Sequence, residues 1–338
     1  MIFARDWTPV HGLMQQEKEE MLEAQTKERM FTALARSIRP CTTLAALGIP
    51  ARERILGDWF MEGDLGFIYA PRGIGKTWMS LELAIAIAEG RDCGPWRSGG
   101  ARRVLYVDGE MPCEAIGGRI AGMGGGSNLA VLNHEALFHL EGYTLNFADP
   151  LAQSALTECM TSCGVQVVFF DNLSCLFSGV RENEADAWEM VLGWLLGLRR
   201  HRIAVVVVHH SGRNKETMRG TSRREDAAFW VMKLEEVAQE QREGACFCSR
   251  FTKDRNSHSE QAAYEWRFSN GMDGRTSIEW TPSSPLEIFR QWVGDGLTSA
   301  EDIAKEMNVT KGRVSQLAKK GIAAGWLTKR GREYALVR

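Results

Sequence analysis

The sequence predicts an α/β fold in which a mainly parallel sheet is flanked by helices, followed by a small helical unit. Strand-length apolar runs recur between residues 64 and 256, and helix-period segments lie between the first four runs. The runs are LGFIYA (65–70), VLYVD (104–108), VQVVFFD (165–171), IAVVVVHH (203–210) and ACFCSRFTK (245–253). Near-continuous Val, Ile and Phe indicate strands buried on both faces, as in a parallel sheet.

Changes in composition predict three parts of the chain. Residues 13–36 lack Gly and Pro and are rich in helix formers, which favours one long helix. WRFS (266–269) and SIEW (277–280) flank an Asp-Gly turn and predict a closing hairpin, after which 281–285 has the composition of a linker. The predicted parts are an N-terminal helical segment (1–50), an α/β domain (51–281) and a C-terminal domain (286–338).

The overall composition is that of an ordinary globular protein. The 338 residues are 44% hydrophobic and 25% charged, with a net charge of -2 that argues against uniform coating of nucleic acid. No apolar run approaches the length of a membrane span, and the N-terminus has no signal core, so we expect a cytoplasmic protein with no membrane partner. The eight cysteines lack zinc-site spacing and are expected to be buried, reduced thiols.

A phosphate-binding turn follows the first apolar run. The sequence LGFIYA-PRGIGKT leads into the helix-period segment 76–89, so backbone N–H groups and a helix N-terminus can converge on phosphate oxygens. Lys76 is expected to reach the β- and γ-phosphates of ATP, and Thr77 to bind Mg²⁺. Ala70 replaces the first glycine of the GxxxxGK[ST] pattern, at a strand end that tolerates a methyl group. The predicted nucleotide-binding residues are Pro71, Arg72, Gly73, Ile74, Gly75, Lys76, Thr77 and Trp78.

Carboxylates end the next two runs. Glu110 follows a strand that we expect to lie next to the phosphate strand, from where it could orient or deprotonate the attacking water. Asp108 is the alternative base, although a turn-forming role before Gly109 is favoured for it. Asp171 ends a buried strand, which is where a carboxylate that holds the Mg²⁺ hydration shell is needed.

Histidines and cations follow the remaining strands. His210 is interpreted as a group that hydrogen-bonds the γ-phosphate, with an ordinary strand-end histidine as the alternative; His209-His210 lacks further ligands for a metal site. The loop 211–226 is long and basic. Lys253 and Arg255 are spaced to point the same way from a strand, so they could approach one target or form a solvated charged edge.

These motifs together resemble the RecA-like hexameric ATPases and helicases, closest to the plasmid RepA type and more distantly to DnaB. The resemblance covers roughly 50–270 and depends on GKT, VLYVDGEMP, VVFFDN, VVVHHSG, MRGTS and KDRN in this order. It implies Glu110 as the catalytic base, Asp171 as the magnesium partner and His210 as the sensor. It also implies that a neighbouring subunit inserts Arg219 toward the γ-phosphate. Lys253 and Arg255 resemble the finger pair of the DnaB group, and the sequence leaves open whether these two act on the neighbouring subunit.

The same resemblance implies a homohexameric ring with single-stranded DNA in its central channel. The loops 174–187 and 211–222 then face the DNA, with Arg213 and Lys215 as contacts from the second loop. The first loop is more acidic than basic, with Arg181 as its single cation.

The C-terminal sequence is typical of a winged helix-turn-helix. Ser299 is expected to cap a helix at 300–307 and Thr310 a second helix ending near 322, before a wing with Gly331 in its turn. Residues 298–338 hold nine Lys and Arg against four Asp and Glu. Such a unit binds duplex DNA or docks a protein. The predicted DNA contacts are Lys311, Arg313, Gln316, Lys319, Lys329 and Arg330.

The sequence therefore predicts a DNA-dependent ATPase motor, a replicative-type helicase or translocase of a plasmid, phage or other mobile element. Two alternatives remain open. One is an ATP-switched DNA-binding regulator or loader that separates no strands. The other is a protein-remodelling or signalling ATPase with a protein-docking winged helix. The acidic loop 174–187 keeps both of them open.

Overall fold

The computed structural model describes residues 8–178, 185–211, 223–237, 244–258, 261–307 and 309–337. Contacts divide the chain into two units, Met1–Ala51 and Arg52–Arg338. The first unit contains the predicted long helix as α1 (Thr8–Ser37) and a short 3-10 helix η1 (Cys41–Leu47). Every residue from 18 to 50 whose exposure is described is exposed. The exposed side chains include apolar ones: Met21, Leu22, Met30, Phe31, Leu34, Ile38, Leu44, Leu47 and Ile49.

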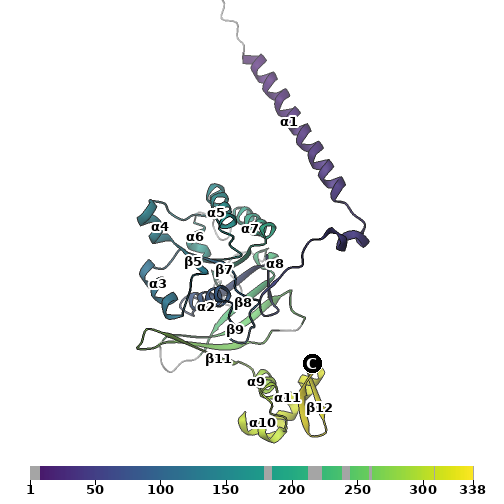
Figure 1. Ribbon diagram of the computed structural model, residues 1–338, viewed down its shortest axis with the longest axis vertical. Coiled ribbons are helices and arrows are strands. Elements are labelled where there is room, and N and C mark those ends of the chain that lie inside the picture. Colours follow the sequence, from purple (N-terminus) through teal and green to yellow (C-terminus); the bar gives the residue numbers. More distant parts are fainter. Residues whose placement is uncertain are drawn as a thin grey trace, which may run out of the picture. The chain divides into compact units, whose positions relative to one another are not determined.

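The second unit is built on a nine-stranded sheet with the order β11-β10-β9-β8-β3-β7-β6-β4-β5 (Figure 1). Six neighbouring strands, from β8 to β5, are parallel, and β9, β10 and β11 extend the sheet in antiparallel fashion. The strands are β3 (Leu65–Ala70), β4 (Val104–Asp108), β5 (Leu129–Asn133), β6 (Val167–Asp171), β7 (Ala204–His210), β8 (Trp230–Glu236), β9 (Ala245–Asp254), β10 (Tyr264–Asn270) and β11 (Thr276–Pro282); β1 (Arg54–Leu56) and β2 (Phe60–Met61) form a separate hairpin. The predicted α/β class is therefore present.

Helices flank this sheet, and each sheet face has its own apolar core. Because side chains alternate along a strand, Ile68 packs with α2 in one core while its neighbour Phe67 packs with α5 and α7 in the other. The helices of this unit are α2 (Lys76–Glu89), α3 (Cys113–Gly122), α4 (His134–Glu141), α5 (Pro150–Ser162), α6 (Leu173–Leu176), α7 (Ala185–Gly197), η2 (Leu198–His201) and α8 (Arg223–Ala227). No described helix is long and apolar enough to cross a bilayer.

The C-terminal segment (285–337) has a core of its own. Phe289, Ile303, Val314, Leu317 and Tyr334 are buried together. Its elements are α9 (Pro285–Gly294), α10 (Ala300–Glu306), α11 (Lys311–Ala323) and the hairpin β12 (Leu327–Arg330) and β13 (Glu333–Leu336). The side chains of Ser299 and Thr310 accept hydrogen bonds from backbone N–H groups of α10 and α11, so both predicted caps are confirmed.

The prediction for the cysteines is only partly right. All eight are free thiols, but only Cys93 and Cys248 are buried. Five are exposed because they lie on outward-facing positions or in surface segments: Cys41, Cys113, Cys159, Cys163 and Cys175.

Candidate active site

The phosphate-binding turn has the backbone shape that its glycines permit. Gly73 (φ +79°) and Gly75 (φ +123°) lie in the left-handed region, and α2 begins directly afterwards at Lys76. A Cβ atom on Gly75 would come within 2.6 Å of the Phe247 ring, so the space also requires glycine there. Ala70 is fully buried in the core at the end of β3, which explains how its methyl group is accommodated.

The turn opens onto a cavity of about 250 Å³ that gathers most of the predicted site residues. It is lined by Arg72, Gly73, Gly75, Lys76, Thr77, Trp78, Glu110, Arg119, Asp171, His210, Gly244 and Ala245. Two of the predicted nucleotide-binding residues do not line it: Ile74 packs against the core, and Pro71 contributes its carbonyl oxygen to Lys76. The Lys76 Nζ atom donates to the carbonyl oxygens of Pro71 (2.9 Å) and Ala70 (3.2 Å). Burial lowers the pKa of Lys76, against the attraction of Asp171 and Glu110.

Asp171 provides a buried carboxylate beside Thr77. The Tyr106 hydroxyl donates to Asp171 Oδ2 (2.8 Å) and also contacts Ser80 Oγ (2.7 Å). Burial raises the pKa of Asp171 to about 6, although hydrogen bonds from Tyr106 and Thr77 oppose the shift. A hydroxyl and a carboxylate are the hard oxygen donors that suit Mg²⁺, so these residues fit that ion. Among the described residues, no cluster of three or more His, Cys, Asp or Glu could hold a metal by itself.

The two carboxylates after β4 have different roles. Asp108 is fully buried and accepts hydrogen bonds from the backbone N–H groups of Glu110 (3.2 Å) and Met111 (3.3 Å), and from Asn133 Nδ2 (2.7 Å). Asp108 therefore stabilises the turn after β4, which is the role that the sequence favours for it. Glu110 is exposed at the cavity and receives a hydrogen bond from the Asn172 side chain.

The expectation that β4 neighbours the phosphate strand is wrong. Strands β7 and β6 lie between β3 and β4. Glu110 still reaches the cavity because the carboxyl ends of all these parallel strands meet at one edge of the sheet. His210 arrives at the same edge, since β7 pairs with β3 and His210 lies opposite Ala70.

Other predicted cations are not in this cavity. Arg213, Lys215 and Arg219 fall outside the described residues. Lys253 and Arg255 lie at the opposite end of the sheet, where the parallel strands begin. Strand β9 runs antiparallel to β8, so Asp254 pairs with Trp230 at the start of β8. The six residues of β3 separate the two edges by roughly 20 Å.

Lys253 and Arg255 do point to one target, as their spacing predicts. Lys253 Nζ donates to the carbonyl oxygens of Glu225 and Asp226, and Arg255 Nη2 donates to that of Asp226 (2.9 Å). Within one chain this target is the end of α8. Their own phosphate-binding turn is out of reach.

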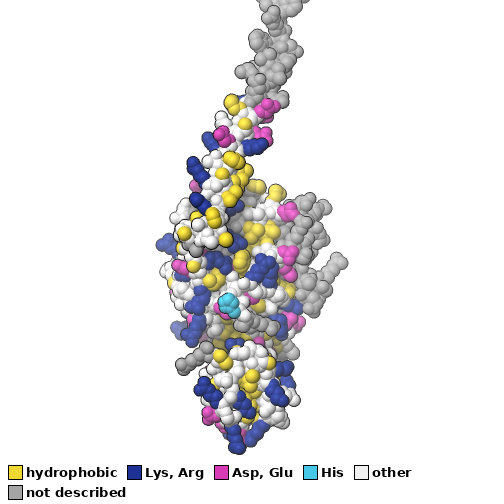
Figure 2. Space-filling model, turned by 90° about the vertical axis from the view of Figure 1, so that its right-hand side faces the viewer, with side chains coloured by type: hydrophobic (Ala, Val, Ile, Leu, Met, Phe, Trp, Pro, Cys, Tyr) yellow, Lys and Arg dark blue, Asp and Glu magenta, His cyan; other side chains and the backbone are white. Residues whose placement is uncertain are grey.

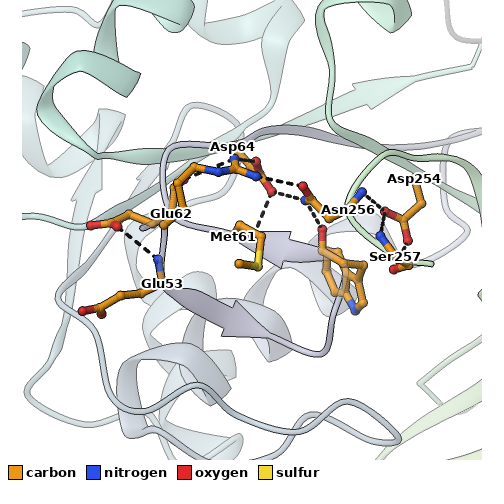
Figure 3. A network of polar contacts seen from close by, with 9 residues as sticks. Glu53, Met61, Glu62, Asp64, Asp254, Asn256 and Ser257 are labelled. Carbon is orange, nitrogen blue, oxygen red and sulfur yellow. Dashed lines mark hydrogen bonds and ion pairs between the residues drawn. The ribbon is translucent and has the colours of Figure 1, made fainter. Parts of the chain in front are cut away.

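A polar network holds the end of strand β9, where these two cations lie (Figure 3). Asp64 is fully buried and accepts from Met61 N (2.8 Å) and Asn256 Nδ2 (2.6 Å), and Arg52 pairs with it at 2.5 Å. Asp254 accepts from the backbone N–H of Asn256 (2.9 Å). Burial raises the pKa of Asp64, although the Met61 N–H group and Arg52 oppose the shift.

Several site residues were not anticipated from the sequence. Arg119 on α3 places its guanidinium carbon 4.7 Å from the centre of the Trp78 ring, at the cavity wall. Gly244 and Ala245 reach the cavity from the start of β9, and Tyr106 supports Asp171 from β4. A polar residue inside an apolar strand was the available signal for Tyr106; nothing local marks the others.

Residues 40–216 match a protein family described as AAA domain. Similar solved structures include the flagellar accessory protein FlaH from Methanocaldococcus jannaschii, with 12% identity, a TM-score of 0.44, and coverage of 64% of this chain and 90% of that one. Another is the KaiC-like protein PH0186 from Pyrococcus horikoshii OT3, with 14% identity, a TM-score of 0.48, and coverage of 65% and 91%. No curated protein matches the sequence.

Proposed function

Because this chain belongs to the AAA domain family, we propose that it is an ATP-hydrolysing, DNA-dependent motor. We place it with the RecA-like helicases or translocases of plasmids, phages and other mobile elements, acting as a homohexameric ring. The observation that carries the proposal is the meeting of Lys76, Thr77, Glu110 and Asp171 around one cavity behind a glycine turn.

In this proposal each residue acts on a phosphate or on water. Lys76 and the N–H groups of the turn bind the β- and γ-phosphates of ATP, and His210 contacts the γ-phosphate. Thr77 and Asp171 would hold Mg²⁺, which supplies charge neutralisation when bound. Glu110 orients a water in line with the γ-phosphorus and accepts its proton as ADP leaves.

Two features support a multi-subunit ring. Lys253 and Arg255 lie at the sheet edge opposite their own cavity, which fits cations that complete the site of a neighbouring copy. Helix α1 exposes several apolar side chains, visible in yellow in Figure 2, and exposed apolar side chains suit packing against an adjacent subunit.

The C-terminal segment supports DNA binding. Its order of helices and hairpin fits a winged helix-turn-helix, and the visible face of the segment carries many Lys and Arg side chains (Figure 2). Positive side chains on a second helix and a hairpin suit contacts to phosphates. Those exposed on α11 and the hairpin are Lys311, Arg313, Lys319, Lys320, Lys329, Arg330 and Arg332.

Steady-state ATP hydrolysis tests the proposal. The wild type and Lys76→Ala are each measured alone, with single-stranded DNA and with duplex. Strong stimulation by single strands that is absent in Lys76→Ala supports the motor. Stimulation by duplex alone would instead indicate a regulator or loader. A hydrolysis rate that changes with neither kind of DNA would indicate a partner protein for the C-terminal segment.

A further inference from the structure

One buried amide joins Glu110 to a short helix at the active-site edge. Asn172 is 1% exposed and directly follows Asp171 at the end of β6. Its Nδ2 atom donates to Glu110 Oε2, while its Oδ1 atom accepts from the backbone N–H of Cys175 (3.2 Å) as the N-cap of α6. The same side chain therefore holds a catalytic carboxylate and the start of a helix.

The end of β4 and helix α6 are also packed directly together. The Gly109 N–H group donates to the carbonyl oxygen of Asp171 (2.8 Å). A Cβ atom on Gly109 would come within 2.7 Å of Leu176 and 3.2 Å of Cys175, so no space separates the two elements. A shift of α6 must therefore move Gly109 or Asn172, and both are bonded to Glu110, one along the chain and one through the hydrogen bond.

We propose that Asn172 is a positioning residue that couples α6 to Glu110. The inference rests on the proposed ATP hydrolysis, because Glu110 needs a fixed position only to act on water. The neutral amide donor restrains one carboxylate oxygen and leaves the other to take a proton. Nothing in these contacts touches Lys76 or the glycine turn, so the coupling acts on the rate of hydrolysis and leaves nucleotide binding alone.

Two substitutions separate the two bonds of Asn172. Asn172→Asp keeps an oxygen to cap α6 but loses the donor and puts a like charge beside Glu110; Asn172→Ala loses both bonds. Asp149→Ala is the matched control, because Asp149 caps α5 through Leu151 N (2.9 Å) away from Glu110. The measurements are kcat and KM for ATP, with and without single-stranded DNA, and the affinity for a fluorescent ADP analogue.

Both Asn172 variants are expected to lose roughly 10- to 100-fold in kcat, as a misplaced catalytic group does, with KM and ADP affinity changed less than about 2-fold. Asp149→Ala should keep the wild-type kcat. A wild-type kcat in Asn172→Asp, or a parallel loss of ADP affinity, would overturn the inference and leave Asn172 as a cap alone. Absence of Lys76-dependent hydrolysis in the wild type would overturn the proposed function first, and this inference with it.

Discussion

Replacing Arg52 by alanine should weaken the folded core, and more so at pH 7 than at pH 4. Arg52 is the charged partner of Asp64, whose side chain is fully buried. The substitution leaves the Asp64 carboxylate with the neutral donors Met61 N and Asn256 Nδ2. A buried charge that loses its partner must be stabilised by neutral groups alone, at a cost in folding free energy.

The structure bounds the size of this effect. Removing one partner of a fully buried ion pair costs about 3–5 kcal/mol, whereas an exposed pair contributes about 0–1 kcal/mol. The Arg52 side chain is 37% exposed while that of Asp64 is 0% exposed, which places this pair between the two limits. With two neutral donors retained, we expect a loss of about 2 kcal/mol in the free energy of unfolding at pH 7.

The pH dependence follows from the pKa of Asp64. Burial raises this pKa above its ordinary value of 3.8, so the folded state favours the protonated carboxyl. The stability from that preference is complete below the unfolded pKa and is lost as the pH rises through the folded pKa. Without Arg52 the pKa of Asp64 in the folded state rises further, because the positive charge that opposes the effect of burial is gone. The difference between variant and wild type should therefore shrink as the pH falls toward 4.

Urea unfolding followed by tryptophan fluorescence measures this difference at both pH values. Trp59 lies beside the network, since its carbonyl oxygen accepts from Asn256. Arg275→Ala is the control, because the Arg275 side chain is 87% exposed and its guanidinium lies 4.0 Å from the Asp273 carboxylate. A loss of equal size at pH 4 and pH 7 would refute the electrostatic reasoning, as would a loss below about 0.5 kcal/mol at pH 7.

Three further perturbations test other parts of the chain. Gly75→Ala should lower nucleotide affinity at least about 10-fold, because its Cβ would meet Phe247 at 2.6 Å; an unchanged titration with a fluorescent ADP analogue would contradict this. Phe289→Ala should destabilise the C-terminal segment by about 3–5 kcal/mol in thermal unfolding, while DNA-independent hydrolysis stays constant. Deleting residues 13–36 should reduce the assembly to smaller species by light scattering, and an unchanged mass would argue against a role for α1 in assembly.

The sequence predicts the parallel strands β3, β4, β6 and β7 well, because nearly all of their residues are apolar and buried. The predicted bounds of 65–70 and 104–108 coincide with β3 and β4. Strand β8 is not predicted, because WVMKLEE contains Lys233 and two glutamates and therefore lacks the apolar run expected of an interior strand. In the structure β8 nevertheless lies between β3 and β9. Edge strand β5 was missed for a related reason, since two of its five residues are exposed and leave only a short apolar signal.

The active site divides in the same way. The turn around Lys76 could be predicted because its chemistry is contiguous in sequence. The order of β3, β7, β6 and β4 could not, because it depends on long-range pairing that leaves no local signal. For the same reason the sequence does not predict that Gly244 lines the cavity, because Gly244 lies far along the chain from the turn.

In the proposed ring, the placement of Lys253 and Arg255 at the end of the sheet opposite the cavity would have a genetic consequence. In a ring whose sites are completed between subunits, a chain lacking Lys76 fails at its own cavity, and a chain lacking Arg255 fails at that of its neighbour. Co-assembly of these two inactive chains therefore pairs an intact cavity with an intact cation at some junctions. Intragenic complementation between two null alleles is then possible, whereas two alleles that fail at the same edge cannot rescue each other.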